Sequence, residues 1–455
     1  MNHSHNNTIE FLPSGKQSYE RRWELLELAK ESIHIVTFSF MNDGTTKKLL
    51  EILKQKAKNG VRIRIIYDDI VNRTTFMTRS LSQLRKYGIE VFGYNSLLDG
   101  WYVDRKKGSP FKQIAMNIKL KLKQHFHEKY MIVDNKYVIL GGINWGDKYA
   151  FGGIEPKAWR DTDVYLQGDC VRDIQLQFLK DYEMQYAWKA RDHKRLKTYI
   201  SFCEEYRPIY KNDQYHKVLY PEYFKNASSY NDFGSVDIKY VVHKPYDLAK
   251  LDLTDQLLEK IGNAKSRIYW GCHGIRPPKI FGEYFAAAVK RGVKVVLITN
   301  SKLSSKTLML NGLLGWMYVE CTKHFKYLLQ NGIEIYEWQK AGAFHSKNLV
   351  IDDAFCSIGS YNIANGSAFH HSESNVLIQD KAFCDQVFNQ FEVDLRDCKK
   401  VEMNDFQFPK DDAFERIIHE RNKLIRQDLW TSSIALDIQN QRYKSFPLYE
   451  FIDIS

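Results

Sequence analysis

Residues 127–134 read His127-Glu128-Lys129-Tyr130-Met131-Ile132-Val133-Asp134, and residues 141–144 read Gly141-Gly142-Ile143-Asn144. The second half of the chain repeats both at the same spacing, as His345-Ser346-Lys347-Asn348-Leu349-Val350-Ile351-Asp352 and Gly359-Ser360-Tyr361-Asn362. Alternate side chains of a strand share a face, so His and Lys point the same way in each copy. The apolar run that follows predicts a buried strand ending at Asp. Two complete copies indicate a duplicated unit.

The sequence around the motifs repeats as well. Asn59-Gly60-Val61-Arg62-Ile63 corresponds to Arg291-Gly292-Val293-Lys294-Val295, and Gly88-Ile89-Glu90-Val91 corresponds to Gly332-Ile333-Glu334-Ile335. In both halves a helix closed by Gly precedes an apolar, β-branched run, which predicts helices and strands in alternation. We therefore expect an α/β fold made by tandem duplication, with mixed sheets flanked by helices and the active site at the interface of the two halves.

The repeat also divides the chain into segments. Residues 1–200 are expected to form the first half, 201–245 a connecting segment, 246–400 the second half and 401–455 a C-terminal appendage. The chain has 455 residues, of which 44% are hydrophobic and 27% charged. It is therefore long enough for two cores and has the composition of a folded protein.

The formal net charge of +11 favours polyanionic partners such as nucleic acid, anionic lipid or phosphate compounds, without choosing among them. The seven cysteines are scattered, which argues against a disulfide scaffold and a zinc site and favours a reducing compartment. The polar start of the chain is not expected to be a signal peptide. No apolar run is long enough to span a bilayer, so any membrane contact is expected to be peripheral.

The two His-x-Lys-x4-Asp motifs resemble the signature of the phospholipase D superfamily, which occurs in two halves. The first half also carries Gly141 to Tyr149 and then Trp159 to Val164, a combination that looks like bacterial cardiolipin synthases. Gly142 departs from the superfamily pattern, which usually has Ser there, but Gly is common in that family. The resemblance covers about residues 23–393. It implies transfer of a phosphatidyl group from one phospholipid to the alcohol of another, or to water.

The motif residues suit chemistry at a phosphodiester, an anion that needs positive charge and hydrogen-bond donors around its non-bridging oxygens. Lys129 and Lys347 supply ammonium groups. Asn144, Ser360 and Asn362 are the candidate phosphate-binding residues, and the glycines beside them let the backbone approach. Because lysines supply the charge, no metal and no other cofactor is expected.

The two histidines are expected to divide the catalytic work. One neutral imidazole attacks phosphorus and forms a phosphohistidine, while the other, protonated, gives its proton to the leaving alkoxide. The second step reverses these roles, with water or an alcohol as acceptor. Chemistry alone allows either assignment; the resemblance implies that His127 is the nucleophile and His345 the general acid.

Each imidazole needs an orienting acceptor on its other nitrogen. The resemblance places a carboxylate downstream of each motif, and the candidates are Asp161, with Asp163 as its rival, and Glu373. The sequence leaves open which carboxylate serves which histidine. Asp134 and Asp352 complete the catalytic motifs, and we expect them to brace the strand ends rather than touch substrate.

Other polar residues near the motifs are given no catalytic role. His125, His370 and His371 are expected to be bystanders at a polar cleft. Intact His and Lys in both halves argue against a non-enzymatic lipid-binding scaffold.

Two segments beside the motifs bear on membrane contact. Lys106, Lys107 and residues 111–123 mix lysines with apolar residues, and residues 308–318 are apolar with a Trp. Such segments suit docking to anionic lipid but are also typical of buried amphipathic elements, so both interpretations stay open. The expected partners are a phospholipid substrate and, peripherally, an anionic membrane surface. Nucleic acid is not expected, and the oligomeric state is left open.

We expect a cytoplasmic protein or one at the inner-membrane face of a bacterium, with export as an effector as the alternative. Two competing functions remain, a metal-independent endonuclease of the same superfamily and an exported hydrolytic phospholipase D. The apolar flank argues against the endonuclease, because a nucleic-acid groove alternates aromatic residues with Arg.

Overall fold

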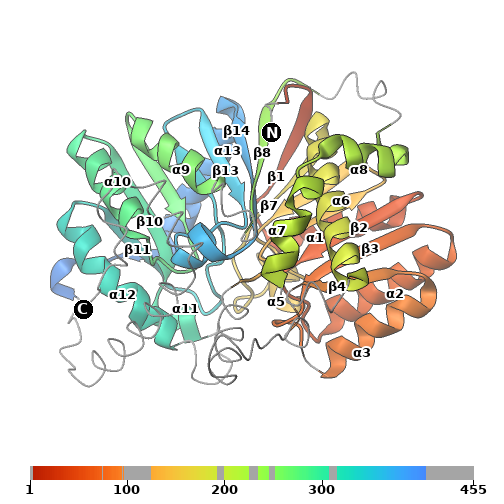
Figure 1. Cartoon of the computed structure of the whole chain (residues 1–455). Coiled ribbons are helices and arrows are strands. Elements are labelled where there is room, and N and C mark those ends of the chain that lie inside the picture. Colours follow the sequence, from red (N-terminus) through yellow and green to blue (C-terminus); the bar gives the residue numbers. More distant parts are fainter. Residues whose placement is uncertain are drawn as a thin grey trace, which may run out of the picture.

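Two β-sheets lie side by side and form the frame of the molecule (Figure 1). The structure is a computed structural model that describes residues 4–73, 75–94, 96, 124–191, 199–224, 234–244, 252–306 and 315–405. The lysine-bearing flank at residues 106–123, most of the apolar segment at residues 308–318, and the appendage from residue 406 onward lie outside the described residues.

The first sheet has seven strands among the described residues. Their spatial order is β1 (Asn7–Leu12), β7 (Asp163–Gly168), β6 (Tyr137–Gly141), β5 (Tyr130–Val133), β2 (Ser32–Thr37), β3 (Arg62–Asp68) and β4 (Glu90–Tyr94). Strands β2, β3 and β4 are parallel, and the other neighbouring pairs are antiparallel.

The second sheet has eight strands in the described part of the chain. Their order is β15 (Cys398–Lys400), β11 (Glu334–Trp338), β10 (Lys294–Asn300), β9 (Arg267–Gly271), β12 (Leu349–Ile351), β13 (Phe355–Gly359), β14 (Glu373–Gln379) and β8 (Asp237–His243). Strands β9, β10 and β11 are parallel, and the other pairs are antiparallel. Apart from β15 this is the plan of the first sheet, so the expected duplicated fold with mixed sheets is confirmed.

Strand β8 lies inside residues 201–245, where the sequence predicts a connecting segment. It pairs with β14 as β1 pairs with β7, so each repeat opens with an edge strand. Its residues alternate in burial but include Asp, Lys, Tyr and His, and so they do not stand out from the polar segment around them. Before it come α7 (Tyr199–Tyr210) and α8 (Asp213–Leu219), which pack on α6 (Asp169–Ala190).

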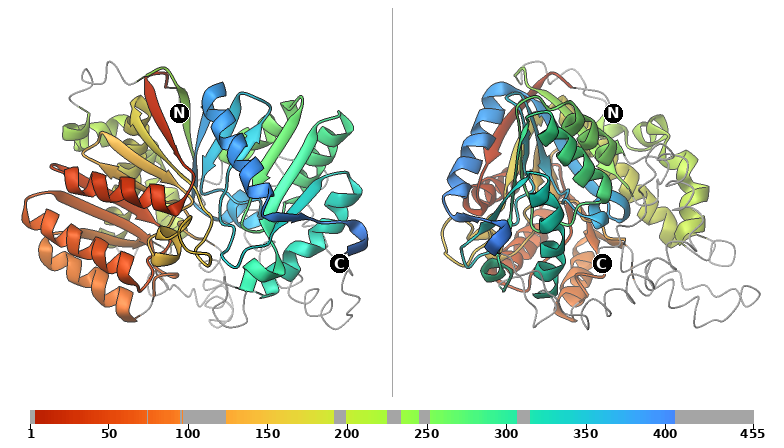
Figure 2. Two further views of the ribbon diagram at one scale, coloured as in Figure 1. Left: turned by 180° about the vertical axis from the view of Figure 1, so that it is seen from behind. Right: turned by 90° about the vertical axis from the view of Figure 1, so that its left-hand side faces the viewer.

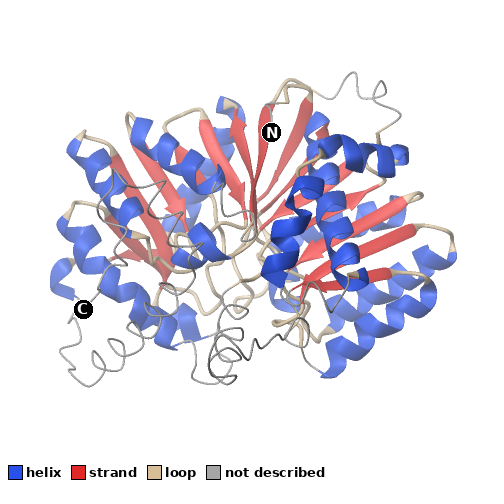
Figure 3. Ribbon diagram, viewed as in Figure 1, coloured by secondary structure: helices blue, strands red, loops and turns tan. Residues whose placement is uncertain are grey.

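Helices cover both faces of each sheet (Figure 3). One face of the first sheet packs on α1 (Gly15–Leu28), α2 (Gly44–Lys58) and α3 (Thr75–Leu84), red to orange in the view from behind (Figure 2). The corresponding face of the second sheet packs on α9 (Asp252–Asn263), α10 (Lys279–Lys290) and α12 (Gly315–Gln330). The opposite faces pack on α6 and α13 (Lys381–Leu395). Strands buried on both faces are continuous apolar runs, which is why the sequence predicts the central ones clearly.

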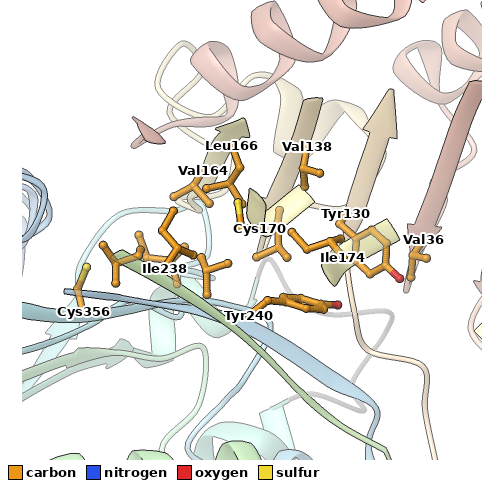
Figure 4. Close-up of a cluster of buried hydrophobic side chains, with 14 of the residues drawn as sticks. Val36, Tyr130, Val138, Val164, Leu166, Cys170, Ile174, Ile238, Tyr240 and Cys356 are labelled. Atoms are coloured by element: carbon orange, nitrogen blue, oxygen red, sulfur yellow. The ribbon is translucent and has the colours of Figure 1, made fainter. Parts of the chain in front are cut away.

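One hydrophobic core continues from the first half into the second (Figure 4). It joins Val164 of β7 to Ile238 of β8 and Cys356 of β13, all fully buried. At the same junction the ring of Phe11 on β1 lies 5.9 Å from the ring of Phe383 on α13. Burial of apolar surface contributes about 25 cal/mol per Å², so this shared core holds the halves as one unit.

A buried ion cluster crosses the same junction. Lys244, which follows β8, has its Nζ 2.8 Å from Asp181 on α6 and in contact with Glu128 of the first motif. Ser372 of the second half also donates to Glu128. Removing one member of such a cluster leaves a buried charge without compensation, so the cluster fixes the first motif against the second half.

Candidate active site

The two motifs lie at equivalent places, at the start of a central strand in each sheet. His127 and Lys129 precede β5, and His345 and Lys347 precede β12. Both strands are fully buried and join the parallel part of the sheet to the antiparallel part. The four side chains are buried as well, with 7% of each histidine and 1% of each lysine exposed.

Backbone hydrogen bonds hold each motif against the other half. The N–H of His127 donates to the carbonyl of Ser372 (2.9 Å), and the N–H of His345 donates to the carbonyl of Arg160 (2.7 Å). In each case the accepting residue stands directly before a candidate carboxylate of the opposite half. The main chain therefore aligns each histidine with that carboxylate.

The orienting carboxylates are exchanged between the halves. The Nδ1 atom of His127 lies 3.0 Å from Oε2 of Glu373, and the Nδ1 atom of His345 lies 2.6 Å from Oδ2 of Asp161. This pairing is the feature that the sequence leaves open. Neither histidine has its acceptor without the other half.

The two carboxylates have different surroundings, because one half has Gly142 where the other has Ser360. Ser360 donates from Oγ to Glu373 (2.5 Å). A Cβ atom at Gly142 would lie 2.2 Å from Oδ1 of Asp161, so the Asp161 carboxylate fills the space that a serine needs. The departure of Gly142 from the superfamily pattern thus has a steric reason. Asp163, the rival candidate, lies 2.8 Å from a buried arginine of α1 instead.

The first dyad is a neutral imidazole beside a carboxylate anion. Burial lowers the pKa of His127 to about 3, although Glu373 opposes the shift. Burial alone would raise the pKa of Glu373, but His127 and His371 hold it well below its ordinary value. Ser360 and Ser367 each donate to this carboxylate at 2.5 Å. With Nδ1–H donated to Glu373, the lone pair of His127 is on Nε2, as a nucleophile requires.

The second dyad, His345 and Asp161, differs from the first in the pKa of its carboxyl group. Burial raises the pKa of Asp161 to about 6, against the opposing charge of Lys347. Burial also lowers the pKa of His345 well below its ordinary value, and Lys347, Lys129 and His127 add to the lowering. The two dyads therefore differ in electrostatics while sharing one plan. The exchanged carboxylates bring both rings to the junction of the two halves.

The motif lysines put two buried positive charges into this site. Each Nζ donates to the backbone carbonyl of the histidine of its own motif. Burial lowers the pKa of Lys129 to about 7, with Glu373 opposing and Lys347 adding to the shift. Burial lowers the pKa of Lys347 as well. A bound anion stabilises both ammonium groups, so the site favours an anionic ligand.

The three candidate phosphate-binding residues lie beside the motifs and are partly committed to the scaffold. Asn144 donates from Nδ2 to the hydroxyl of Tyr149 (2.9 Å) and accepts at Oδ1 from a backbone N–H of the loop after β2 (3.1 Å). The hydroxyl of Ser360 is bonded to Glu373, which makes it a positioning residue. Asn362 is half-buried at the place equivalent to Asn144. Contact of these residues with a phosphate stays a prediction.

Asp134 and Asp352 lie at the ends of β5 and β12 remote from the histidines. Asp134 accepts from the backbone N–H groups of residues 30–32 at 2.8–2.9 Å. Asp352 accepts from those of residues 265–267 at 2.7–3.1 Å. Their φ angles are 52° and 53°, in the left-handed region that Asp adopts more readily than most residues. Both therefore brace the turns that lead into β2 and β9.

Asp134→Ala is expected to lower the free energy of unfolding by roughly 2–4 kcal/mol, because three backbone N–H groups, of which that of Ser32 is buried, lose a charged acceptor. Asp134→Asn should lose less, since an amide oxygen still accepts and Asn tolerates positive φ. Denaturant unfolding measures both. A large loss of turnover in Asp134→Ala with unchanged stability would contradict the bracing role.

Two of the expected bystander histidines lie closer to the chemistry than the sequence indicates. The ring of His371 is 5.6 Å from that of His127 and 5.3 Å from that of His125, whose Nδ1 is 3.1 Å from Asp68. The ligand atoms of His127, His371 and Glu373 lie within 4.8 Å of one another, a spacing that suits a metal ion. Two of these residues, His127 and Glu373, form the first dyad, so an ion there would compete with the His127–Glu373 bond.

Comparison with known proteins identifies the family of the chain. The family model described as "Cardiolipin synthase, PLD-like domain" matches residues 23–152 and 257–395, more than half of the chain. The chain is 26% identical over 404 residues to the major cardiolipin synthase ClsA of Bacillus subtilis (strain 168), covering 88% of this chain and 71% of the relative. It is 24% identical over 403 residues to a cardiolipin synthase of Clostridium perfringens (strain 13 / Type A), covering 88% and 73%.

A solved structure shows the same fold. The phosphatidylserine synthase of Haemophilus influenzae Rd KW20 superposes with a TM-score of 0.64 at 14% identity, covering 94% of this chain and 95% of that chain. Duplicated mixed sheets with a His-Lys pair from each half at their junction define an enzyme of the phospholipase D superfamily. Within that superfamily, the chain belongs to the cardiolipin synthase family with PLD-like domains.

Proposed function

We propose that the protein transfers the phosphatidyl group of a phospholipid, by way of a phosphohistidine on His127, to the alcohol of an acceptor molecule or to water. This proposal rests on the two histidine–carboxylate pairs, in which each histidine is bonded to a carboxylate of the other half. They supply one neutral imidazole beside an ionised carboxylate, Glu373, and a second imidazole, His345, beside a carboxyl, Asp161, whose pKa burial raises to about 6. The cardiolipin synthases and the phosphatidylserine synthase that the chain resembles support a phospholipid as the substrate.

The proposed reaction has two displacements at phosphorus. In the first, Nε2 of His127 forms a bond to phosphorus as the bond to the leaving alkoxide breaks, and His345 gives that alkoxide a proton. In the second, His345 takes the proton of the acceptor hydroxyl, whose oxygen bonds to phosphorus as the N–P bond breaks. Lys129 and Lys347 offset the charge on the non-bridging oxygens throughout. The phosphate anion also raises the pKa of His345 and so favours the imidazolium of the first step.

The test is incubation of the purified protein with labelled phosphatidylglycerol, labelled phosphatidylethanolamine and supercoiled plasmid DNA. A lipid product without nicked plasmid supports the proposal, with His127→Ala as the control for contaminating activity. Nicked plasmid without a lipid product supports the endonuclease instead. The ratio of phosphatidic acid to transferred lipid separates hydrolysis from transfer.

Peripheral contact with a membrane is also part of the proposal. In the described residues no helix is both long enough and apolar enough to cross a bilayer. The formal charge of +11 suits peripheral contact with an anionic lipid surface at the inner-membrane face.

The profile of kcat/KM is expected to have a break near pH 7, above the break set by the general acid His345, whose pKa in the free enzyme lies well below its ordinary value. Burial lowers the pKa of Lys129 to about 7, so the free enzyme loses this ammonium as the pH rises through that value. A profile of kcat/KM reports groups of the free enzyme, so the rate should fall by about a further tenfold per pH unit above this break. The limb of kcat should lie higher, because bound phosphate stabilises the ammonium.

The measurement is a pH profile from 5 to 9 with a soluble short-chain substrate. Lys129→Arg keeps its charge over this range and should remove the break near pH 7, at a lower absolute rate. A wild-type kcat/KM that stays level to pH 9 would contradict the role given to Lys129.

A further inference from the structure

A third imidazole, that of His371, lies against the first dyad. The Nδ1 atom of His371 is 3.6 Å from Oε1 of Glu373, and the Nδ1 atom of His127 is 3.1 Å from the same oxygen. The three residues each offer a ligand atom, and these atoms lie within 4.8 Å of one another. Because 24% of the His371 side chain is exposed, a small ion can reach this cluster from solvent.

The backbone around His371 holds its ring in this position. A single turn of π-helix, η5 (Gly366–His370), comes directly before it, and the N–H of His371 donates to the carbonyl of Gly366 (2.8 Å). A Cβ atom at Gly366 would lie 2.6 Å from Cε1 of the imidazole, so the glycine leaves the space that the ring fills. The Nδ1 atom of His371 is buried and has no hydrogen-bond partner in the described part of the chain. Such an atom in a fixed ring indicates a ligand.

The second dyad has an indole in the corresponding place. Trp159 stands two residues before Asp161, as His371 stands two residues before Glu373, and its ring lies 5.1 Å from that of His345. An indole N–H is a donor only and offers no lone pair to a cation. Among the described residues, the cluster at the first dyad is the only group of three or more His, Cys, Asp or Glu side chains with this spacing.

We propose that His127, His371 and Glu373 form a site for a late first-row transition metal ion such as Zn²⁺, and that the bound ion reversibly inhibits the enzyme. Two imidazoles and one carboxylate are a donor set that binds Zn²⁺ in proteins, and imidazole favours Zn²⁺, Ni²⁺ and Cu²⁺ over Mg²⁺. The first dyad already has its imidazole neutral and its carboxylate ionised, as metal ligands must be. The inhibition rests on the proposed function, whereas the binding does not.

The ion acts by removing the lone pair that attacks phosphorus. A neutral imidazole that binds a cation through Nδ1 carries its one proton on Nε2. The proton that Nδ1 of His127 donates to Glu373 in the free enzyme therefore moves to Nε2, and the ring gains and loses no proton overall. An ion bound through Nε2 takes the attacking lone pair directly. Either way the first displacement stops, so the ion is an inhibitor and not a cofactor.

The first measurement is binding, which needs no substrate. Equilibrium dialysis against buffered Zn²⁺ should find one tight site in the wild type. His371→Gln should raise its Kd by about 100-fold or more, because a lost ligand costs at least as much as a lost outer partner, about 10- to 100-fold. His370→Gln is the matched control, since the same substitution one residue earlier lies outside the cluster and should leave the Kd as it is.

Co²⁺ in place of Zn²⁺ reports which atoms bind the ion. Cobalt held by imidazole and carboxylate in a four-coordinate site gives visible d–d bands without a thiolate charge-transfer band. The chain has seven cysteines, so this distinction matters. The visible bands should be present in the wild type and absent in His371→Gln, and a thiolate band would contradict the proposed ligands.

The second measurement is inhibition, with a soluble short-chain phospholipid because Zn²⁺ bridges anionic vesicles. Zn²⁺ should inhibit the wild type, and a chelator should restore its full rate. Relative to its own metal-free rate, His371→Gln should need about 100-fold more Zn²⁺ for half-inhibition, and His370→Gln should need no more than the wild type. Mg²⁺ prefers oxygen ligands and should inhibit none of the three proteins.

The outcomes distinguish this inference from the function beneath its second half. If the wild type converts no phospholipid but binds Zn²⁺ through His371, the proposed function fails and the metal site stands. If the wild type is active but binds no Zn²⁺, or if His371→Gln binds it equally tightly, the site is wrong while the function stands. Tight binding through His371 that leaves the rate unchanged also overturns the inference, because His127 would then not be a ligand.

Discussion

His127→Ala is expected to lower kcat/KM by about 10⁴-fold or more with every substrate, since removal of a covalent nucleophile leaves no route to the intermediate. His345→Ala is expected to be as damaging with a phospholipid but not with a p-nitrophenyl phosphodiester. That substrate has a leaving group that departs without a proton, so the first displacement no longer needs the general acid. The two histidines are therefore predicted to respond differently to the leaving group.

A burst experiment measures this difference. His345→Ala mixed with the p-nitrophenyl ester should release about one equivalent of p-nitrophenolate per active site and then stop, because the second displacement also needs His345. Mass spectrometry should find the phosphoryl group on the peptide that contains His127. A burst from His127→Ala, with none from His345→Ala, would reverse the assignment.

The local sequence predicts most strands of the two sheets. It does not predict which carboxylate pairs with which histidine in the site. The strands around Ile63, Ile89 and Val295 are apolar runs bounded by helix-ending glycines, and such runs need no partner to be recognised. The repeated His-x-Lys spacing is visible in the sequence, although both residues of each pair lie just before the predicted strand and not on it. Strand β8 is missed because its pairing with β14, and not its own composition, makes it a strand.

The exchange of carboxylates depends on contacts that no local pattern contains. The N–H of His127 meets the carbonyl of Ser372 across 245 residues of chain, because the two sheets pack on a shared core. That register decides that Glu373 serves His127. The steric need for Gly142 follows in turn, since it depends on where the Asp161 carboxylate lies.

The loops after β2 and β9 place Phe38 beside His127 and His273 beside His345, and this difference between the halves has a weak sequence signal. Phe38 and His273 align when β2 and β9 are superposed through the bonds of Asp134 and Asp352 to the chain just before each strand. Without those bonds, the loops after the strands share no residues that fix the alignment. His273 is therefore found by structural comparison of the two repeats.

Glu373→Gln is expected to lower kcat by about 10³-fold or more, whereas Asp161→Asn should cost only about 10- to 100-fold. The single oxygen of Gln can accept from only one of Ser360 and Ser367, which donate to different oxygens of Glu373, and its amide nitrogen donates to Nδ1 of His127. The proton of the imidazole then moves to Nε2, and the lone pair that attacks phosphorus is lost. A serine protease with the equivalent Asp-to-Asn change loses about 10⁴-fold for this reason.

Asp161 has a different partner and a different task. His345 must carry protons on both nitrogens in the first displacement, and an Asn oxygen still accepts from Nδ1–H in that state. Burial raises the pKa of Asp161 to about 6, whereas the pKa of Glu373 lies well below its ordinary value. Near neutral pH a larger fraction of Asp161 than of Glu373 is therefore protonated. Removing the charge of Asp161 should therefore change the rate less.

The comparison is made on kcat in the steady state and on the p-nitrophenolate burst, with thermal melting to show that both variants are folded. Glu373→Gln should abolish the burst, and Asp161→Asn should keep it while slowing later turnover. Ser360→Ala is the matched control, since it removes one donor to Glu373 and leaves the charge, so its loss should lie between wild type and Glu373→Gln. Equal losses in the two carboxylate variants would show that the dyads are equivalent and that the charge of Glu373 does not select the nucleophile.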